Sequence, residues 1–153
     1  MCKPGKKMHD VYVKQFNEFG YDARSLGCPK GRQDIRYKSL CSEVEDNSNL
    51  LDFGCGFGDL ANFLIKNNLN VNYSGCDIVE DFIQKARENH PKDNFYQMNF
   101  DDKISKQYDH IICSGVFTFL YVDDNQKHQD LVFSKIQELF DHCDKSLSID
   151  FQS

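Results

Sequence analysis

The sequence predicts an α/β fold in which helices cover a mostly parallel sheet. Three observations support this prediction: strand-like and helical segments alternate after residue 45, the first strand ends in a glycine-rich turn, and the next strand ends at an acid, Asp77. Strands that alternate with helices along a chain pair in parallel through right-handed crossovers. A length of 153 residues fits one domain, which buries about two-thirds of the surface of its unfolded chain.

The turn after the first strand is the most informative stretch of the chain. Residues 49–60 read Asn-Leu-Leu-Asp-Phe-Gly-Cys-Gly-Phe-Gly-Asp-Leu, in which an apolar strand ends in three glycines at alternate positions. Glycines permit a sharp turn and let a ligand lie against bare backbone, while the following helix start offers unpaired N–H groups to negative charge. Strand, glycine turn and helix together are typical of the first unit of a nucleotide-binding α/β fold, although such a turn can also serve packing alone.

Two helices are expected before this strand. Apolar residues at helical spacing predict one helix from His9 to Phe19, closed by Gly20, and another from Gln33 to Val44. Residues 1–8 are expected to form a loose basic tail.

The later segments alternate in the same way. A helix directly follows the glycine turn, and apolar spacing then predicts, in order, a strand at Asn70–Asp77, a helix at Glu80–Asn89, strands at Asn94–Phe100 and Asp109–Ser114, a helix at Asn125–Cys143 and a strand at Ser146–Phe151. We expect the sheet order 3-2-1-4-5, with the chain reversing between strands 1 and 4. Ligands of such sheets bind outside the carboxyl ends of the strands at that reversal, where Gly54, Asp77, Asn99 and Ser114 all lie.

The formal net charge of −6 is unevenly distributed. Residues 1–40 hold nine Lys and Arg against four acids, whereas the remainder holds nine against twenty. A basic segment on an acidic body indicates either an anionic partner or an ordinary solvated surface.

The seven cysteines are scattered and form no Cys-x-x-Cys pair. Cys55, Cys76 and Cys113 fall in or beside strand-like segments, which favours buried reduced thiols over disulfides or a zinc site. The chain has no apolar run of about 18 residues, and its basic N-terminus has no apolar signal core. We therefore expect a soluble, cytoplasmic protein without a metal.

The motifs resemble those of class I S-adenosylmethionine-dependent methyltransferases. Residues 51–60 resemble the first motif of that family, Asp77-Ile78 its second-strand acid, and residues 108–117 its fourth-strand motif, while Asn99-Phe100 falls where the family often has Asp and an apolar residue. The resemblance spans roughly residues 33–151 in order. It implies a Rossmann-like three-layer sandwich and a single methyltransferase domain over residues 1–153.

Within that domain, the resemblance implies that residues 45–153 form the cofactor-binding core and that residues 1–44 lie near the mouth of the cofactor and substrate site. The implied cofactor is S-adenosyl-L-methionine, with S-adenosyl-L-homocysteine as the product. The residues that the resemblance assigns to the cofactor are Gln33, Arg36, Asp52, Gly54, Cys55, Gly56, Asp59, Asp77, Ile78, Asn99, Phe100, Ser114 and Gly115. Among them, Asp77 would hold the ribose hydroxyls, Asn99 the adenine edge, and Asp52 would line the methionine part.

The carboxylate of that methionine part has two candidate anchors, Gln33 and Arg36, because a planar guanidinium suits a carboxylate. Ser114 and Gly115 would approach the sulfonium. A dinucleotide is disfavoured, since its fingerprint requires glycine or alanine where Asp59 stands, and a carboxylate would face a pyrophosphate badly.

The family normally adds a helix and two strands after the fifth strand, so the sheet is expected to lack these last two strands. An exposed edge strand is a liability unless it is covered. We therefore expect the edge at Ser146–Phe151 to be protected by a homodimer or by the N-terminal helices.

The methyl acceptor is signalled weakly. Ser114-Gly115-Val116-Phe117 occupies the position where amino-methylating DNA enzymes carry Asp, Asn or Ser, two prolines and an aromatic residue, but both prolines are absent. In this interpretation Ser114 and Phe117 are the catalytic residues: Ser114 accepts a hydrogen bond from the target amine, and Phe117 stacks on an extruded base. Phe119 and Tyr121 would extend the stacking surface. The alternative is that Phe117 packs under the long helix.

Our leading hypothesis is therefore N-methylation of an exposed amine in nucleic acid, such as adenine N6, with low sequence specificity. Lys30, Arg32 and Lys38 would then lie where phosphates run. The first alternative is a small-molecule N- or O-methyltransferase, whose first forty residues form a lid and offer His9, Tyr12 and Tyr21 as acid–base or orienting groups. A second alternative is a protein that binds S-adenosylmethionine without catalysis.

Overall fold

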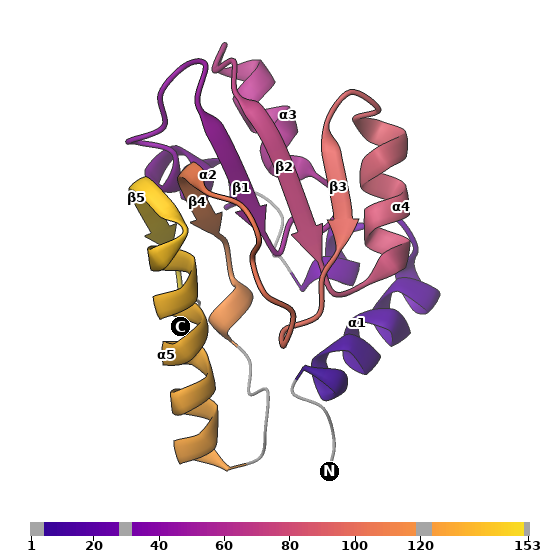
Figure 1. Ribbon diagram of the computed structural model, residues 1–153. Helices are drawn as coiled ribbons and strands as arrows, with labels where there is room; N and C mark the ends of the chain where they lie inside the picture. Colours follow the sequence, from indigo (N-terminus) through magenta and orange to yellow (C-terminus); the bar gives the residue numbers. More distant parts are fainter. Residues whose placement is uncertain (1–4, 28–31, 119–123, 152–153) are drawn as a thin grey trace.

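Five parallel strands form one sheet in the order β3-β2-β1-β4-β5 (Figure 1). The computed structural model describes residues 5–27, 32–118 and 124–151. Its strands are β1 (Asn49–Phe53), β2 (Asn72–Asp77), β3 (Asn94–Gln97), β4 (Tyr108–Cys113) and β5 (Cys143–Ile149). The predicted strand order and the Rossmann-like α/β fold are confirmed.

Two helices precede β1 and the others alternate with strands, as the periodicity indicated. They are α1 (Lys6–Phe19), α2 (Gln33–Leu40), α3 (Asp59–Lys66), α4 (Glu80–Asn89) and α5 (Asn125–Asp141), with short 3-10 helices at η1 (Ala23–Leu26) and η2 (Val116–Thr118). The predicted bounds of α4 are correct, because His90-Pro91 stops that helix.

Several predicted bounds are wrong. Helix α1 begins at Lys6 instead of His9, so residues 6–8 belong to this helix and not to a loose tail. Shifts of one or two residues occur at β2, which begins at Asn72, at β4, which spans Tyr108–Cys113, at α5, which ends at Asp141, and at β5, which ends at Ile149.

Three further ends differ as well. Helix α2 ends at Leu40 instead of Val44, because the chain turns there, with the N–H of Val44 bonded to the carbonyl of Cys41. Strand β3 ends at Gln97 instead of Phe100, where the Asp102 carboxylate takes the next free N–H, that of Asn99. Strand β5 begins at Cys143 instead of Ser146, and the polar residues of its first half gave no strand pattern.

Each face of the sheet carries its own hydrophobic layer. Successive side chains of a strand point to opposite faces, and Leu50 and Leu51 of β1, both completely buried, enter different layers. Leu50 packs with residues of α2, α3 and α4, such as Leu60, whereas Leu51 shares its layer with Leu139 of α5. The sheet is thus the middle of three layers.

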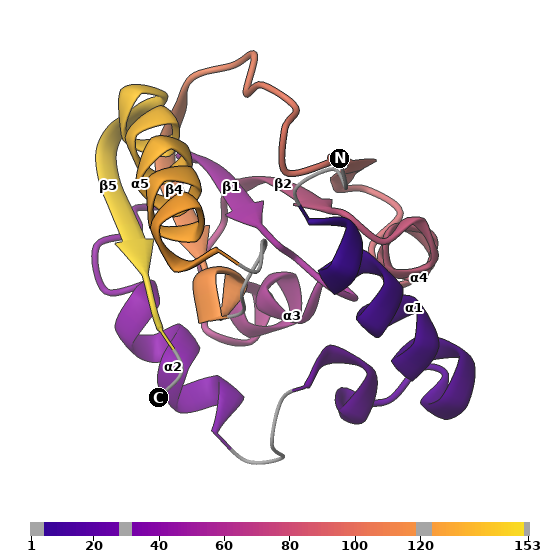
Figure 2. The same ribbon diagram turned by 90° about the horizontal axis from the view of Figure 1, so that it is seen from below.

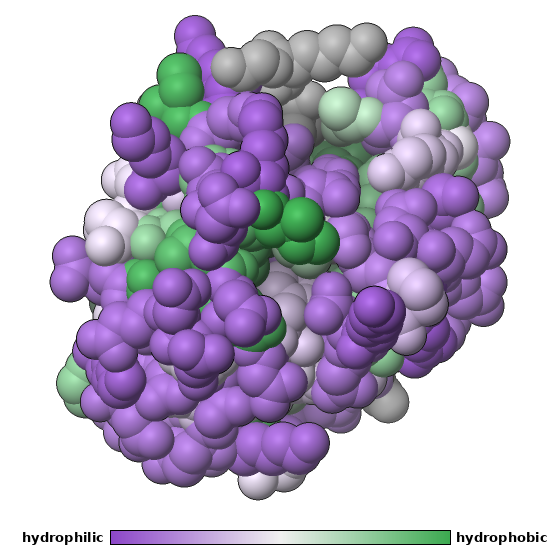
Figure 3. Space-filling view, turned by 90° about the horizontal axis from the view of Figure 1, so that it is seen from above, coloured by the Kyte–Doolittle hydropathy of each residue, from purple (hydrophilic) through white to green (hydrophobic). Residues whose placement is uncertain are grey.

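The carboxyl ends of the strands are covered by the N-terminal part of the chain (Figure 2). Phe16 of α1 contacts the rings of Phe57 and Phe82, with ring centres 6.0 and 5.6 Å apart. The opposite end of the molecule presents mostly hydrophilic side chains (Figure 3). The apolar cover over the carboxyl ends marks that end of the sheet for a site.

Strand β5 is an edge strand with β4 as its neighbour. Helix α1 lies at the other end of the sheet, beside α4 (Figures 1 and 2), and α2 reaches the end of β5 through an ion pair between Arg36 and Asp150. These helices therefore do not lie along the outer edge of β5. Protection of that edge by a second copy stays a prediction.

The described cysteines are free thiols, and Cys41, Cys55, Cys76 and Cys113 are buried. Burial raises the pKa of each of these four thiols. Within the described ranges, no group of three or more His, Cys, Asp or Glu side chains could hold a metal ion. No helix in that part of the chain has the length and apolar character to cross a membrane.

Candidate functional site

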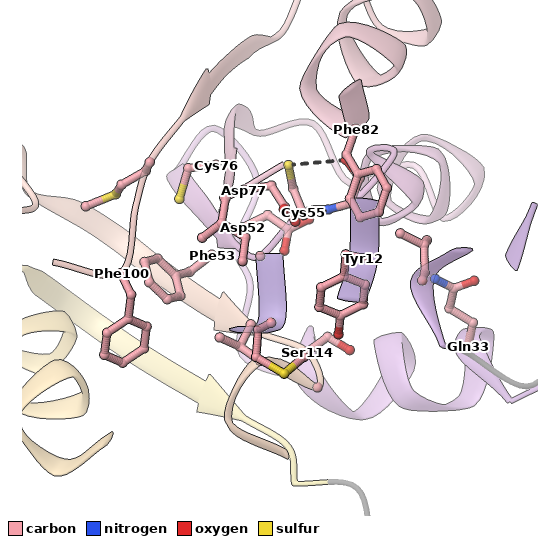
Figure 4. A pocket seen from close by; sticks show the side chains of 18 of the residues that line it. Tyr12, Gln33, Asp52, Phe53, Cys55, Cys76, Asp77, Phe82, Phe100 and Ser114 are labelled. Atoms are coloured by element: carbon pink, nitrogen blue, oxygen red, sulfur yellow. Dashed lines mark hydrogen bonds between the residues drawn. The ribbon is translucent and has the colours of Figure 1, made fainter. Parts of the chain in front are cut away.

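A pocket lies at the carboxyl ends of β1, β2 and β4, under α1, η1 and α2 (Figure 4). It contains most of the residues that the sequence assigns to a cofactor. The predicted residues that line it are Gln33, Asp52, Gly54, Cys55, Gly56, Asp77, Ile78, Phe100, Ser114 and Gly115. Their roles toward a ligand stay predictions, but the fold brings them to one place.

The glycine turn forms one wall of the pocket. Gly54 and Gly56 have φ angles of 84° and 53°, in the left-handed region that favours glycine. A Cβ at Gly54 would overlap the Cγ2 methyl of Val116, and a Cβ at Gly56 would lie 2.9 Å from Cδ2 of Leu26. The bare backbone is therefore what lets the segment after β4 and the η1 turn close over this wall.

Asp77 connects the glycine turn to the end of β2. Its carboxylate accepts hydrogen bonds from the N–H of Gly56 and from the N–H of Val79, both at 3.0 Å. Burial raises the pKa of Asp77, while these backbone donors favour the ionised form. Each carboxylate oxygen can accept more than one hydrogen bond, so Asp77 can hold the turn and still receive ligand hydroxyls.

Asp52 is a buried carboxyl in the pocket, 3% exposed. The hydroxyl of Tyr73 donates a hydrogen bond to it at 2.6 Å. Burial raises the pKa of Asp52 to about 7, and the neighbouring charges of Asp77 and Asp59 act in the same direction. A cation near Asp52 would favour the ionised carboxylate and offset part of its desolvation cost.

Apolar side chains form another wall, and here one prediction is wrong. Met98 and Phe100 line the pocket and are buried, whereas Asn99 between them is exposed. The amide of Asn99 donates to the Asp102 carboxylate at 3.1 Å, so Asn99 is not placed to meet an adenine edge. The neighbours of Asn99, Met98 and Phe100, reach the pocket in its place.

Helix α1 contributes Met8 and Tyr12, one turn apart, to the pocket. Figure 4 shows Tyr12 pointing into the pocket. Of the three candidate orienting groups, Tyr12 alone lines it: His9 lies beside Asp10, and Tyr21 is 54% exposed. The sequence pattern marked α1 as amphipathic but did not indicate which of its residues face a ligand.

Arg36 does not line the pocket. Its Nε and Nη2 donate to the two oxygens of Asp150 at 2.8 and 3.0 Å, and Nη2 also donates to Ser114 Oγ at 2.8 Å. The carboxylate that Arg36 was expected to find in a ligand is therefore supplied by the chain itself. Asp59, the first residue of α3, also lies outside the lining, 3.5 Å from the amide of Gln33.

Phe117 is 4% exposed and lies in the core. Its ring stacks on Phe53, with ring centres 6.4 Å apart and planes 21° apart. The prediction that Phe117 stacks on an extruded base is therefore wrong, because core packing takes the ring away from any ligand. Phe119, Tyr121 and Lys30 lie outside the described residues.

Sequence reasoning missed several residues of the pocket. Those are Met8, Leu26, Tyr37, Phe53, Cys76, Phe82, Met98 and Val116. Tyr37 follows Gln33 by one helical turn, and Val116 follows Gly115, so adjacency to a predicted residue was the available signal. For Met8 and Leu26 no local signal exists, since their role depends on how the N-terminal part folds over the sheet.

Residues 51–149 match a family model described as a methyltransferase domain. No curated protein sequence matches the chain.

Three solved structures are similar to this chain. Coclaurine N-methyltransferase bound to N-methylheliamine and SAH is 17% identical with a TM-score of 0.61, and the match covers 76% of this chain and 35% of that one. An S-adenosylmethionine-dependent methyltransferase from Clostridium acetobutylicum ATCC 824 is 18% identical with a TM-score of 0.61, and the match covers 96% of this chain and 57% of that one. The sugar N-methyltransferase KedS8 from Streptoalloteichus sp ATCC 53650 is 18% identical with a TM-score of 0.60, and the match covers 93% of this chain and 53% of that one. The chain thus spans between about a third and three-fifths of the length of these proteins, and the likeness shows the fold.

Proposed function

The chain belongs to the methyltransferase domain family, and from this premise we propose that it transfers a methyl group from S-adenosyl-L-methionine to a nitrogen atom of a small acceptor. One observation carries the proposal. A single pocket joins the glycine turn, two carboxyl groups and an apolar wall under a cover formed by α1.

The residues of this pocket fit the proposed cofactor. Asp77 offers carboxylate oxygens to ribose hydroxyls, Met98 and Phe100 offer an apolar surface to adenine, and Asp52 offers a carboxyl to the cationic methionine part. The glycine turn provides bare backbone that a Cβ would obstruct. When bound, S-adenosylmethionine supplies a methyl group activated by a positively charged sulfur.

The task of the protein is then to align the acceptor and to exclude water. Alignment alone can contribute several kcal/mol to a bimolecular reaction, about 7–11 kcal/mol in the best intramolecular cases. Met8 and Tyr12 of α1 and Val116 after β4 enclose the pocket with Phe100, and Tyr12 adds a phenol that can orient a polar acceptor group.

A nitrogen acceptor suits the chemistry of this pocket. Among the described residues that line it, none is a histidine or a lysine, and Asp52 is deeply buried. A neutral amine carries its own lone pair and attacks without prior loss of a proton, whereas an alcohol needs a general base. Two structurally similar proteins are N-methyltransferases, one of coclaurine and one of a sugar.

N-methylation of nucleic acid is the second candidate. Arg32 and Lys38 are exposed near the α2 side of the pocket, which favours an anionic polymer. The burial of Phe117 weighs against it, because the stacking partner that this reaction was expected to use is in the core. A binding protein without catalysis is the third candidate.

These candidates separate in one experiment. The protein is incubated with methyl-labelled S-adenosylmethionine and, in parallel, with undigested DNA, undigested RNA and a panel of small primary and secondary amines. We expect label in the small amines and formation of S-adenosylhomocysteine. Label in the polymer that falls steeply with salt would support nucleic acid instead. Cofactor binding without label in any acceptor tested would favour the non-catalytic candidate.

A further inference from the structure

The carboxylate of Asp150, directly after β5, collects hydrogen bonds from two distant parts of the chain. Arg36 of α2 donates to both of its oxygens, and the N–H of Gly115 and the hydroxyl of Ser114 donate from the segment after β4. Ser114 also accepts from Arg36, which closes the network. No sequence motif marked Asp150.

One arm of this network leads to the α2 side of the pocket. Arg36 lies between Gln33 and Tyr37, both of which line the pocket. Gln33 and Tyr37 are also joined to each other, since the amide of Gln33 donates to the Tyr37 hydroxyl at 2.7 Å. Holding Arg36 therefore holds the turn of helix that presents these two side chains.

The other arm leads to the segment Ser114–Val116, whose three residues all line the pocket. Val116 packs directly over Gly54, where a Cβ would overlap its Cγ2 methyl. Through Gly115 and Ser114, Asp150 therefore sets how this segment meets the glycine turn.

We infer that Asp150 is a positioning residue for the proposed methyl transfer, which holds α2 and the segment Ser114–Val116 at fixed places around the bound donor. The inference rests on the proposed function. Asp150 is not among the residues that line the pocket, so it acts through Arg36, Ser114 and Gly115. The side chain of Asp150 is 23% exposed and that of Arg36 is 21% exposed, so the two groups are not part of a water-free core.

The test measures the affinity of the full chain for S-adenosylhomocysteine by calorimetry, with the thermal midpoint as a check on folding. Asp150→Asn keeps an acceptor for Gly115 but removes the charge that pairs with Arg36, whereas Asp150→Ala removes both. We expect Kd to rise about tenfold for Asp150→Asn and further for Asp150→Ala, because one or two charge-assisted hydrogen bonds are lost. Asp144→Asn, at an exposed carboxylate of β5, should leave Kd unchanged.

A double-mutant cycle distinguishes positioning from a general loss of stability. Arg36→Gln and Asp150→Asn should each weaken binding, and the double variant should bind about as weakly as the single ones, since both remove the same link. Hydrogen exchange at residues 114–116 should be faster in Asp150→Ala than in the wild type without ligand, and it should stay faster when S-adenosylhomocysteine is added.

Two results would overturn the inference. A folded Asp150→Asn variant that binds S-adenosylhomocysteine as tightly as the wild type would overturn this inference and leave the proposed function standing. Additive effects in the double-mutant cycle would do the same. A wild-type chain that does not bind S-adenosylhomocysteine would overturn the proposed function together with it. If Asp150→Ala does not fold, Asp150→Asn and Arg36→Gln still decide the question.

Discussion

The two sides of the pocket are built in different ways. The side of the glycine turn is made by short consecutive segments at the ends of β1 and β2, and backbone hydrogen bonds join them: the N–H groups of Gly54 and Cys55 both donate to the carbonyl of Cys76. The opposite side is assembled from α1, α2 and the segments after β4 and β5, which side chains hold together. The local backbone of the first side leaves a motif in the sequence, whereas the side-chain contacts that hold the second side together leave none.

The largest effect is expected at the first of these sides. Asp77→Ala removes the acceptor of two backbone hydrogen bonds as well as the proposed ribose contact. Losing hydrogen bonds to a charged group should weaken binding of S-adenosylhomocysteine about a thousandfold, roughly 4 kcal/mol. Calorimetry checks this, with Asp81→Ala, at an exposed acid of α4, as the control. Binding that survives in Asp77→Ala would remove the distinction between the two sides.

The next effect concerns Phe117, a core residue directly after the segment Ser114–Val116 of the second side. Because its ring is buried against Phe53, Phe117→Ala should lower the free energy of unfolding by about 3 kcal/mol. Phe117→Leu, which keeps most of the buried volume, should cost about 1 kcal/mol. Urea unfolding measures both. A variant with wild-type stability but lost methylation of a nucleic acid would show that Phe117 acts on a substrate and that its core position is not its main role.

The same contrast explains what the sequence could predict. Strand order followed from the alternation of elements, because each crossover had to be right-handed and short. The residues at the ends of β1 and β2 followed from the glycine turn and Asp77, since φ angles above zero and a strand-end acid leave a local signature. The predicted residues at these two strand ends that line the pocket are Asp52, Gly54, Cys55, Gly56, Asp77 and Ile78.

The failures lie where tertiary contacts decide. Arg36 was expected to bind a ligand carboxylate, but Asp150, 114 positions later in the chain, takes its guanidinium. Asn99 was placed by analogy of position, but a local bond to Asp102 turns it outward and leaves Met98 and Phe100 in the pocket. Neither the periodicity nor the composition of a sequence predicts which of two possible partners a polar side chain binds.

A pH-dependent effect is expected through Asp52. Its pKa in the folded chain is raised to about 7 by burial. The folded state therefore holds a proton that the unfolded chain has lost above about pH 4, so the unfolding free energy should fall from about pH 4 to 7 and level off above. Asp52→Asn should remove this part of the slope, while Asp77 and Asp59, whose pKa values are also raised, keep theirs.

Ligand binding should show the opposite trend at the same residue. The ammonium group of S-adenosylhomocysteine favours ionised Asp52, so affinity should rise as pH increases toward 7 and stay level above it. A fall of one unit in the pKa of Asp52 on binding corresponds to about a tenfold change in Kd. Calorimetry in two buffers with different ionisation enthalpies measures the released proton. Equal proton release by Asp52→Asn and the wild type would assign the titration to another group.

The smallest effect is expected at Tyr12, where KM for the acceptor and Kd for S-adenosylhomocysteine can be compared. Tyr12→Phe keeps the ring and its edge contact with Phe82, with ring centres 6.0 Å apart, and removes the hydroxyl. If Tyr12 orients the acceptor, KM for the amine acceptor should rise about threefold, because one neutral hydrogen bond is lost, while Kd for S-adenosylhomocysteine stays unchanged. Tyr21→Phe, at an exposed tyrosine outside the pocket, is the matched control. Should Kd for S-adenosylhomocysteine rise as much as KM for the amine, Tyr12 belongs to the cofactor side, and α1 closes over the donor before any acceptor arrives.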